Sequence, residues 1–450
     1  MDVADGKENV FVLGMDDFNR AKLETMRGSQ GIRFIPLLSH PQVQGADAYP
    51  VATALQMCRE RLAAFPGPID AIMGYWDFPV TLLVPLLGRE FGVPTPSFES
   101  VLRCEHKYWN RVIGRRVAPA HTPGFRVVDP FDDGALEALD LTPPFWLKPV
   151  KSADAELAFR IRHRQELQRA VPAIRERIGR FAEPFDLLLD LGQMPPEISR
   201  VGGRFCLAEE EISGRQCTVE GYVLDGKAHV HGIIDSHRYP GVSSFLSYEY
   251  PSRLPHALQD RIADVARRLV EGVGLESTTW NVEFFVNERT GGAWILELNP
   301  RLSQSHAHMF DLVDGASNLE IAVALALGRR PDFPNGEGVF RRAAKFYLRV
   351  FEDAVLERVP NARDIERIEE RLPGTRVHVT VPEGARLSDL WGQDSYSYRL
   401  ADIHLGGESP EELTEKFRIC RTLLPFRLAP VPDASPTRLP EKAYRARAIP

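Results

Sequence analysis

Two segments near residue 290, Asn281-Val-Glu-Phe-Phe-Val286 and Ala293-Trp-Ile-Leu-Glu-Leu-Asn299, decide the fold expected for this chain. Each is predicted to form a β-strand, and the polar run 287–292 (Asn-Glu-Arg-Thr-Gly-Gly) is predicted to form the connecting turn. Successive side chains of a strand point to opposite faces, so Glu297 and Asn299 point the same way. The apolar residues of the return strand divide between the faces, with Ile295 beside Glu297 and with Trp294, Leu296 and Leu298 on the other face.

The polar side chains of this hairpin have the chemistry of a metal site. Asn281 and Glu283 share one face of the first strand, and alignment of the strands would place two carboxylates and an amide oxygen beside Arg301. Oxygen ligands of this kind suit Mg²⁺ holding nucleotide phosphates. An alternative is that Arg301 simply neutralises Glu297, and the strand pattern favours this alternative and the metal site equally.

The size and composition of the chain narrow its class. Its 450 residues are enough for about three domains of ordinary globular composition. A net charge of −7 and the lack of an apolar run of about 20 residues argue against nucleic-acid and membrane partners. The five cysteines are scattered and the acidic N-terminus does not resemble a signal peptide, so we expect reduced thiols and a cytoplasmic location.

The order of the predicted elements divides the chain into three parts. Residues 1–105 alternate apolar strands with helices, which predicts a parallel sheet with crossover helices. Residues 106–333 contain helices, a strand at 145–149, a charged helix at 165–181 and hairpins, while residues 334–450 form a smaller mixed part with a proline-rich, irregular tail. The fold class is therefore α/β with α+β parts.

One apparent phosphate-binding loop is rejected. The segment Gly221-Tyr-Val-Leu-Asp-Gly-Lys-Ala228 nearly matches a P-loop, but Ala228 has no hydroxyl group for a metal ion and no helix follows. The Asp-Gly pair between alternating flanks indicates a hairpin instead.

Lysine is rare in this chain, which draws attention to each one. Nine lysines stand among 55 basic residues, so the other 46 are arginines. Lysine is a compact charge suited to a single phosphate oxygen. Lys148 lies in an apolar strand before a proline, and Lys107 opens a helix; the alternative for a lone lysine is a solvated side chain.

With these motifs in order, the chain resembles the ATP-grasp superfamily, specifically its carboxylate–amine ligases of the L-amino acid ligase and biotin carboxylase types. The most specific motifs are NVEFFV (281–286) and ILELNPRLS (295–303). The resemblance implies a Rossmann-like pre-ATP-grasp domain over residues 1–105, a two-lobed nucleotide-binding catalytic domain over 106–333 and a small C-terminal α+β domain over 334–450.

The resemblance also implies roles for single residues. Arg301 and Lys148 would stabilise the transferred phosphoryl group, and Lys107 would join Lys148 in binding the nucleotide. The implied metal ligands are Glu283, Glu297 and Asn299. The segment 207–214 would be the adenine hinge, with backbone amides contributed by Glu209, Glu210, Glu211 and Ile212, although charge alone favours an exposed acidic turn there.

The chain departs from the family pattern at several positions. Gln216 stands where many relatives have a glutamate that contacts ribose. The phosphate lid after Lys148 has no glycine in Lys151-Ser-Ala-Asp-Ala155, and Lys151 is expected to compensate. A second lid is expected over 235–245. The implied substrate-binding residues are His237, Arg238, Ser303, Gln304 and His306, where an exposed loop histidine and a structural histidine are the alternatives for His237 and His306.

The implied activity is ATP-dependent ligation of a carboxylate to an amine through an acyl phosphate, on amino-acid-like substrates, with ATP and Mg²⁺ and with Mn²⁺ as a substitute. The expected partners are the small-molecule carboxylate and amine, and similar enzymes are commonly homodimers. Three alternatives stay open: a biotin-carboxylase-like enzyme, an ATP-binding regulatory protein without catalysis, and a small-molecule kinase.

Overall fold

The computed structural model describes residues 6–45, 49–153, 156–390, 393 and 397–431. The tail predicted to be irregular and the end of the segment 151–155 fall outside the described residues. Within the described part, no helix has the length and apolar character needed to cross a bilayer. All five cysteines are buried and unpaired.

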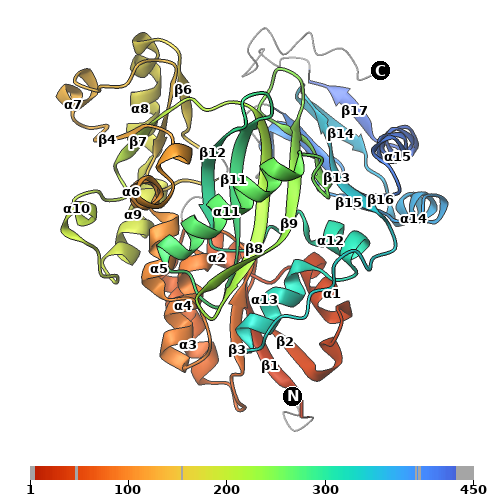
Figure 1. Ribbon diagram of the computed structural model, residues 1–450. Coiled ribbons are helices and arrows are strands. Elements are labelled where there is room, and N and C mark those ends of the chain that lie inside the picture. Colours follow the sequence, from red (N-terminus) through yellow and green to blue (C-terminus); the bar gives the residue numbers. More distant parts are fainter. Residues whose placement is uncertain (1–5, 46–48, 154–155, 391–392, 394–396, 432–450) are drawn as a thin grey trace.

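The N-terminal part is a parallel sheet, as predicted. Its strand order is β2-β1-β3, and α1, α3 and α4 connect or follow the strands (Figure 1). The bounds are β1 (Glu8–Leu13), α1 (Asp17–Thr25), β2 (Ile32–Leu38), α2 (His40–Gln44), α3 (Val51–Ala63), β3 (Ala71–Gly74) and α4 (Val80–Phe91). Two further helices, α5 (Phe98–Glu105) and α6 (Lys107–Val117), lead out of this part.

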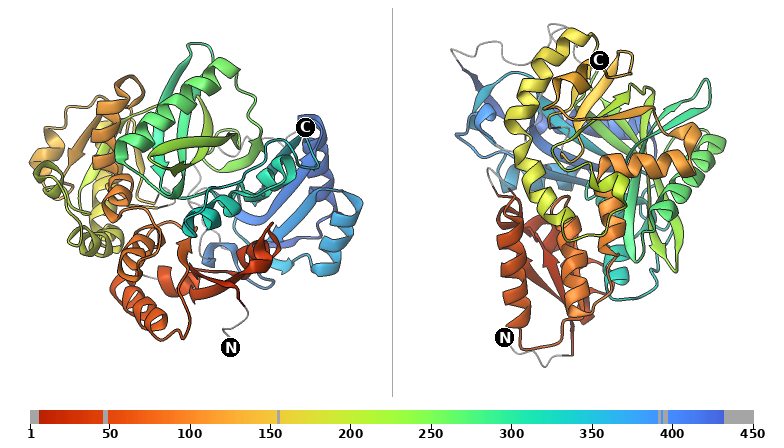
Figure 2. Two further views of the ribbon diagram at one scale, coloured as in Figure 1. Left: turned by 60° about the horizontal axis from the view of Figure 1, so that its bottom comes forward. Right: turned by 90° about the vertical axis from the view of Figure 1, so that its left-hand side faces the viewer.

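A small lobe follows, built on an antiparallel sheet of order β4-β7-β5-β6. Its strands are β4 (Phe125–Val128), β5 (Phe145–Pro149), β6 (Phe159–Ile161) and β7 (Cys206–Glu210). The helix predicted over 165–181 is in fact two helices, α8 (Leu167–Arg177) and α9 (Gly179–Leu189), which extend eight residues further. The lobe stands apart from the large sheet, at the upper left of Figure 1 and to the left in the first view of Figure 2.

The large sheet has eight strands in the order β12-β11-β8-β9-β10-β13-β16-β15. Three of the strands after residue 334 therefore extend the sheet of the preceding part, while two others form a separate two-stranded sheet. Its strands are β8 (Arg215–Leu224), β9 (Lys227–Arg238), β10 (Phe245–Tyr250), β11 (Thr278–Asn287), β12 (Gly292–Asn299), β13 (Arg342–Val350), β15 (Thr375–Val379) and β16 (Tyr398–Gly407). The accompanying helices are α11 (His256–Val273), α12 (Ala307–Asp314), α13 (Asn318–Ala326), α14 (Ala362–Arg371) and α15 (Pro410–Leu423), and β14 (Ala354–Arg358) pairs with β17 (Arg427–Pro430).

The hairpin of β11 and β12 forms as predicted, with one correction. Glu283 lies opposite Glu297, but a bulge follows, so that Phe284 lies opposite Ile295. The extra residue reverses the alternation beyond it, and Ile295 packs in the same core as Leu298. The prediction that Ile295 shares the face of Glu297 is therefore wrong, and Leu296 is only half-buried.

The rejected P-loop is a hairpin between β8 and β9. Asp225 and Gly226 both have positive φ, 53° and 70°, as a type I′ turn requires. No helix follows Lys227, which opens β9 instead.

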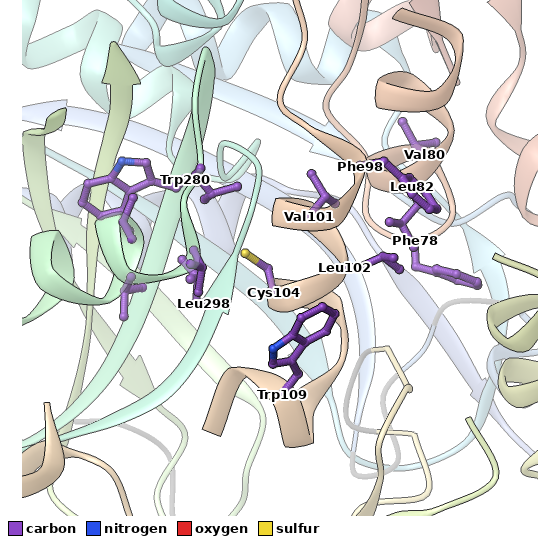
Figure 3. Close-up of a cluster of buried hydrophobic side chains, with 14 of the residues drawn as sticks. Phe78, Val80, Leu82, Phe98, Val101, Leu102, Cys104, Trp109, Trp280 and Leu298 are labelled. Carbon is purple, nitrogen blue, oxygen red and sulfur yellow. The ribbon is translucent and has the colours of Figure 1, made fainter. Parts of the chain in front are cut away.

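A single apolar core links the hairpin to the N-terminal part. Figure 3 shows Trp280 and Leu298 of the hairpin on one side and Cys104 of α5 facing them. The core continues past Phe98 to Phe78. This packing fixes the hairpin against α5 and α6, so the residue that opens α6 is held close to β12.

We expect Gly221→Ala to destabilise the protein by about 3 kcal/mol, because a Cβ there would lie 2.1 Å from the carbonyl oxygen of His229 and 2.3 Å from the Trp280 ring. Urea unfolding of the variant measures this loss. Gly31→Ala is the matched control, because a Cβ at Gly31 meets no atom within 4 Å. An equal effect of the two substitutions would contradict the packing described here.

Candidate active site

Two carboxylates face each other across the hairpin. Glu283 and Glu297 are register partners. Gln216 of β8 donates a hydrogen bond to Glu283 over 2.7 Å. Burial, and then the charge of Glu297, raise the pKa of Glu283 to about 7. The pair is thus arranged so that a cation between the two carboxylates would relieve their repulsion.

An amide network orients the third polar side chain of this face. Asn281 donates to the carbonyl oxygen of Arg301 over 2.9 Å, and its own Oδ1 accepts from Nδ2 of Asn299 at 2.9 Å. The nitrogen of Asn299 is therefore engaged, which leaves its Oδ1 as the atom for a cation. Two carboxylates and an amide oxygen are hard ligands that fit Mg²⁺.

The two predicted lysines line a pocket that Glu297 also lines. Lys107, at the start of α6, lies 3.4 Å from Glu297 and donates to the carbonyl oxygen of Ser152 over 3.1 Å. Desolvation would raise the pKa of Glu297, but Lys107 and Lys148 outweigh it and lower that pKa. The side chain of Glu297 remains 43% exposed, so it is accessible to a ligand.

Lys148 on β5 is held by a buried carboxylate. Its ammonium group pairs with Glu209, which also pairs with Arg111 of α6. Arg111 donates in addition to the carbonyl oxygen of Leu296 over 2.6 Å, at the bulge of β12. Burial would raise the pKa of Glu209, but Arg111 and Lys148 outweigh it and lower the pKa to about 2. The triad ties the small lobe, α6 and the hairpin together.

Arg301 reaches from the end of the hairpin to the N-terminal part. Its guanidinium group pairs with Asp77, which follows β3. Burial opposes ionisation of Asp77, but Arg301 outweighs it and lowers the pKa to about 2. The Nε of Arg301 is buried without a hydrogen-bond partner. The alternative pairing of Arg301 with Glu297 does not form within the described residues.

Lys151 is buried rather than placed in an open lid. It pairs with Glu105 at the end of α5 and lies 4.8 Å from the centre of the Phe78 ring. Burial would lower the pKa of Lys151, but Glu105 outweighs it and raises that pKa. The structure pairs Lys151 with Glu105, and its compensation for a glycine-poor lid remains a prediction.

The predicted adenine hinge forms the end of β7. The backbone N–H of Glu210 donates to the carbonyl oxygen of Gly124 over 2.9 Å, so the predicted contact of this residue with adenine would use its carbonyl oxygen. The carboxylate of Glu209 serves Lys148 and Arg111, and Glu211 pairs with Arg160 at 2.9 Å. The backbone amides of Glu211 and Ile212, which follow the strand, remain the predicted contacts.

Gln216 and Arg238 form a support for Glu283. The Oε1 of Gln216 accepts two hydrogen bonds from Arg238, at 3.1 and 2.6 Å, while its amide nitrogen serves Glu283. Gln216 therefore positions Glu283, and its contact with ribose, for which the amide nitrogen keeps a second N–H, remains a prediction. His237 lies 3.5 Å from Glu249. Both His237 and Arg238 belong to β9, so the turn of the predicted second lid begins only at residue 239.

Three consecutive residues after the hairpin contact three parts of the molecule. Gln304 accepts from Asn19 at 2.8 Å and donates to the carbonyl oxygen of Tyr75 at 3.1 Å, both in the N-terminal part. Ser305 accepts from Lys345 of β13 at 3.2 Å. His306 bonds to Glu220 of β8 at 2.5 Å. Gln304 thus joins this segment to the N-terminal part, and its contact with substrate remains a prediction.

His306 is a buried histidine, and one of its two ring nitrogens has no hydrogen-bond partner among the residues that the structure describes. Burial would raise the pKa of Glu220, but His306 and His231 outweigh it and lower the pKa to about 2, so Glu220 is a carboxylate that accepts from Nδ1 of His306. The Nε2 atom of His306 has no hydrogen-bond partner within the described residues, and it carries a lone pair in the neutral imidazole. The backbone of Ser303 accepts a bond from Asn318 at 2.9 Å, and its hydroxyl stays a predicted substrate contact.

The hairpin alone does not complete a metal site. Within the described ranges, no cluster of three His, Cys, Asp or Glu side chains is placed to hold an ion. Glu283, Glu297 and Asn299 would supply part of an octahedral shell, and the neighbouring lysines indicate that phosphate oxygens supply other ligands.

Four important partners escaped the sequence analysis. Arg111 lies one helical turn after Lys107, a spacing that could have indicated it. Asp77 follows a parallel strand, where ligand-binding residues gather. Nothing in the local sequence singles out Glu105 or Glu220, since their partners are distant along the chain.

Comparisons with known proteins agree with this architecture. Residues 141–307 match the model of a family described as the ATP-grasp domain. A stretch of 76 residues is 36% identical to the carbamoyl phosphate synthase large chain of Thermus thermophilus, covering 17% of this chain and 7% of that protein. A stretch of 68 residues is 34% identical to the corresponding protein of Thermotoga neapolitana, covering 15% and 6%.

Solved structures share the fold over most of the chain. L-amino acid ligase from Bacillus licheniformis has a TM-score of 0.71 at 18% identity, covering 94% of this chain and 99% of that one. Biotin carboxylase from Campylobacter jejuni has a TM-score of 0.65 at 13% identity, covering 94% and 92%. Carboxyaminoimidazole ribonucleotide synthase from Aspergillus clavatus, solved with ATP, has a TM-score of 0.66 at 13% identity, covering 93% and 98%. The expected ATP-grasp fold is confirmed, and the fold alone does not choose among these activities.

Glu209→Gln is expected to destabilise the protein by about 3 kcal/mol, because it leaves Lys148 and Arg111 buried without a counter-charge. Chemical unfolding measures the loss. The neighbouring Glu210→Gln is the matched control and is expected to cost about 1 kcal/mol or less, since Glu210 is exposed. Equal stability of wild type and Glu209→Gln would exclude the proposed triad.

The raised pKa of Glu283 predicts a pH-dependent stability. The folded protein keeps the proton of Glu283 up to pH about 7, whereas the unfolded chain loses it near 4.5, so stability falls as pH rises between these values. In EDTA, Glu283→Gln should therefore be more stable than wild type at pH 8, by on the order of 3 kcal/mol, and similar to it at pH 4.5. Thermal unfolding at the two pH values tests this, and an unchanged difference between them would refute it.

Proposed function

Because this chain contains an ATP-grasp domain within an ATP-grasp fold, we propose that it is an ATP-dependent ligase that joins a carboxylate to an amine. The observation that supports this most is the pairing of Glu283 with Glu297 beside two lysines. A pair of carboxylates flanked by cations suits a metal-bound polyphosphate. An ATP-binding regulatory protein without catalysis would not require all four of these charged side chains.

Glu283, Glu297 and Asn299 would hold Mg²⁺, which when bound neutralises charge on the nucleotide phosphates; Mn²⁺ is expected to substitute. Lys107 and Lys148 flank the same pocket and would bind phosphate oxygens. The amides of Glu211 and Ile212 would contact adenine. These assignments use residues from the hairpin, from α6, and from β5 and the end of β7 in the small lobe.

The proposed reaction has two steps. An oxygen of the substrate carboxylate bonds to the γ-phosphorus as the bond from that phosphorus to ADP breaks, which gives an acyl phosphate. The nitrogen of an amine then bonds to the acyl carbon, phosphate leaves and the nitrogen loses a proton. Arg301 and Lys148 would stabilise the charge on the transferred group.

His306 is our proposed acceptor of the proton lost by the amine. Its Nε2 has no partner in the described part of the chain and offers a lone pair in the neutral ring, while Glu220 fixes the ring through Nδ1. The solved L-amino acid ligase shares the fold over 94% of this chain, and we propose amino-acid-like substrates on that ground. Ser303 and His237 are proposed to contact these substrates.

Glu297→Ala and Asn299→Ala should each abolish Mg²⁺-dependent ATP turnover, with a loss of at least about a thousandfold, while leaving the fold intact. The assay is phosphate release with pooled amino acids, and thermal unfolding checks the fold. Glu288→Ala in the turn of the same hairpin is the control, since Glu288 is exposed and pairs only with Arg215 at 3.1 Å. Unchanged turnover in both site variants would remove the metal assignment, and stimulation by bicarbonate and biotin instead of amino acids would contradict amide formation.

A further inference from the structure

The C-terminal strands of the large sheet have one apolar and one polar face. The apolar side chains Phe346, Val377 and Ile403 pack in a core with α15 residues. On the opposite face, polar residues of β13, β16 and β15 are direct pairing partners, so they form two rows that run across the three strands. The rows are Lys345, His404 and Arg376, and Tyr347, Asp402 and His378.

Other parts of the molecule cover most of this polar face, and only Arg376 on the edge strand β15 is exposed. Phe18 of α1 stacks on His378, with ring centres 4.7 Å apart. His308 of α12 meets His404 edge to face at 5.2 Å. Figure 1 shows α12 beside the strands that carry these residues. A sheet face enclosed by helices is normally apolar, so the polar rows need another explanation.

Two of the cations beside this face have no ion-pair partner among the described residues. Lys345 pairs with Asp402 at 2.9 Å. Lys22 of α1 and Arg376 form no ion pair with any residue that the structure describes. The ammonium nitrogen of Lys22 is buried without a hydrogen-bond partner and lies 4.5 Å from the centre of the Phe18 ring. An uncompensated buried ammonium group is costly.

A buried imidazole adds a second unpartnered group. His404 is 2% exposed, and its Nδ1 has no hydrogen-bond partner. Burial, and then the charge of Lys345, lower the pKa of Lys22 to about 8. Burial followed by Lys22 lowers the pKa of His308 to about 3. Asp16 and Asp311 act on Lys22 from outside ion-pair distance, so neither carboxylate satisfies the hydrogen-bonding capacity of its ammonium group.

We infer that the region between α1, α12 and this polar face binds an anionic group, a carboxylate or a phosphate, of the non-nucleotide substrate. Lys22 and Arg376 are its charged contacts, and His404 is a donor. Only the statement that the anion belongs to the substrate rests on the proposed function.

The region is continuous with the candidate active site. Lys345 donates to Ser305, which lies next to His306, and Ser305 is 3.3 Å from the hydroxyl of Tyr347. Tyr248 bridges the two places, because its ring lies 5.6 Å from that of Tyr347 and 4.9 Å from that of His306. The substrate acid would thus carry a second anionic group besides the carboxylate that reacts.

The test uses the full-length protein, with inorganic phosphate and succinate as probes at constant ionic strength. Thermal unfolding is titrated for wild type, Lys22→Met and Arg376→Met, and for the exposed controls Lys227→Met and Arg418→Met. At least one probe should stabilise wild type and both controls, and its apparent affinity should fall at least about tenfold in the two site variants. Preference for phosphate or for succinate identifies the class of the anionic group.

A second readout separates binding from a structural role. Without a probe, Lys22→Met should raise the melting temperature, because it removes a buried unpaired charge; a structural lysine would lower it. ADP binding is measured in parallel and should be unchanged in all variants. If the wild-type protein does not bind ADP, the proposed function is refuted but the anion site is not. Site variants that respond to the probes like wild type, or a wild type that responds to neither, would overturn the anion site.

Discussion

The register between β11 and β12 is the constraint on which the rest of the structure depends. It places Glu283 opposite Glu297, and burial together with their mutual repulsion raises the pKa of Glu283. Two like charges are kept together only if the surroundings hold them. Gln216 of β8 donates to Glu283, and Lys107 of α6 lies beside Glu297. The neighbouring strand and α6 therefore both stabilise this carboxylate pair.

Charge pairs join the parts of the chain at the same place. The bulge of β12 exposes a carbonyl oxygen to Arg111, and Arg301 pairs with Asp77 of the N-terminal part. The segment after the hairpin then contacts each part in turn through Gln304, Ser305 and His306. A ligand that replaces one of these pairs would therefore change the forces between the parts, which is how a closing motion would be coupled to binding.

Periodic and turn signals made much of the fold predictable. The parallel N-terminal sheet, the Asp-Gly hairpin and the strand pair around residue 290 follow from local patterns. The bulge was not predictable, because the alternation of apolar and polar residues in β12 does not indicate an extra residue. The prediction for the face of Ile295 was wrong for this reason. The union of the C-terminal strands with the large sheet, and partners such as Glu105 and Glu220, depend on contacts between residues far apart in sequence.

The central claim is that one cation lies between Glu283 and Glu297 when nucleotide is bound. Crystals grown with ADP and Mn²⁺ and measured at the manganese absorption edge test it directly. We expect an anomalous peak from the manganese ion about 2.1 Å from a carboxylate oxygen of each glutamate. A structure with ADP bound and the manganese peak located away from both carboxylates would contradict it.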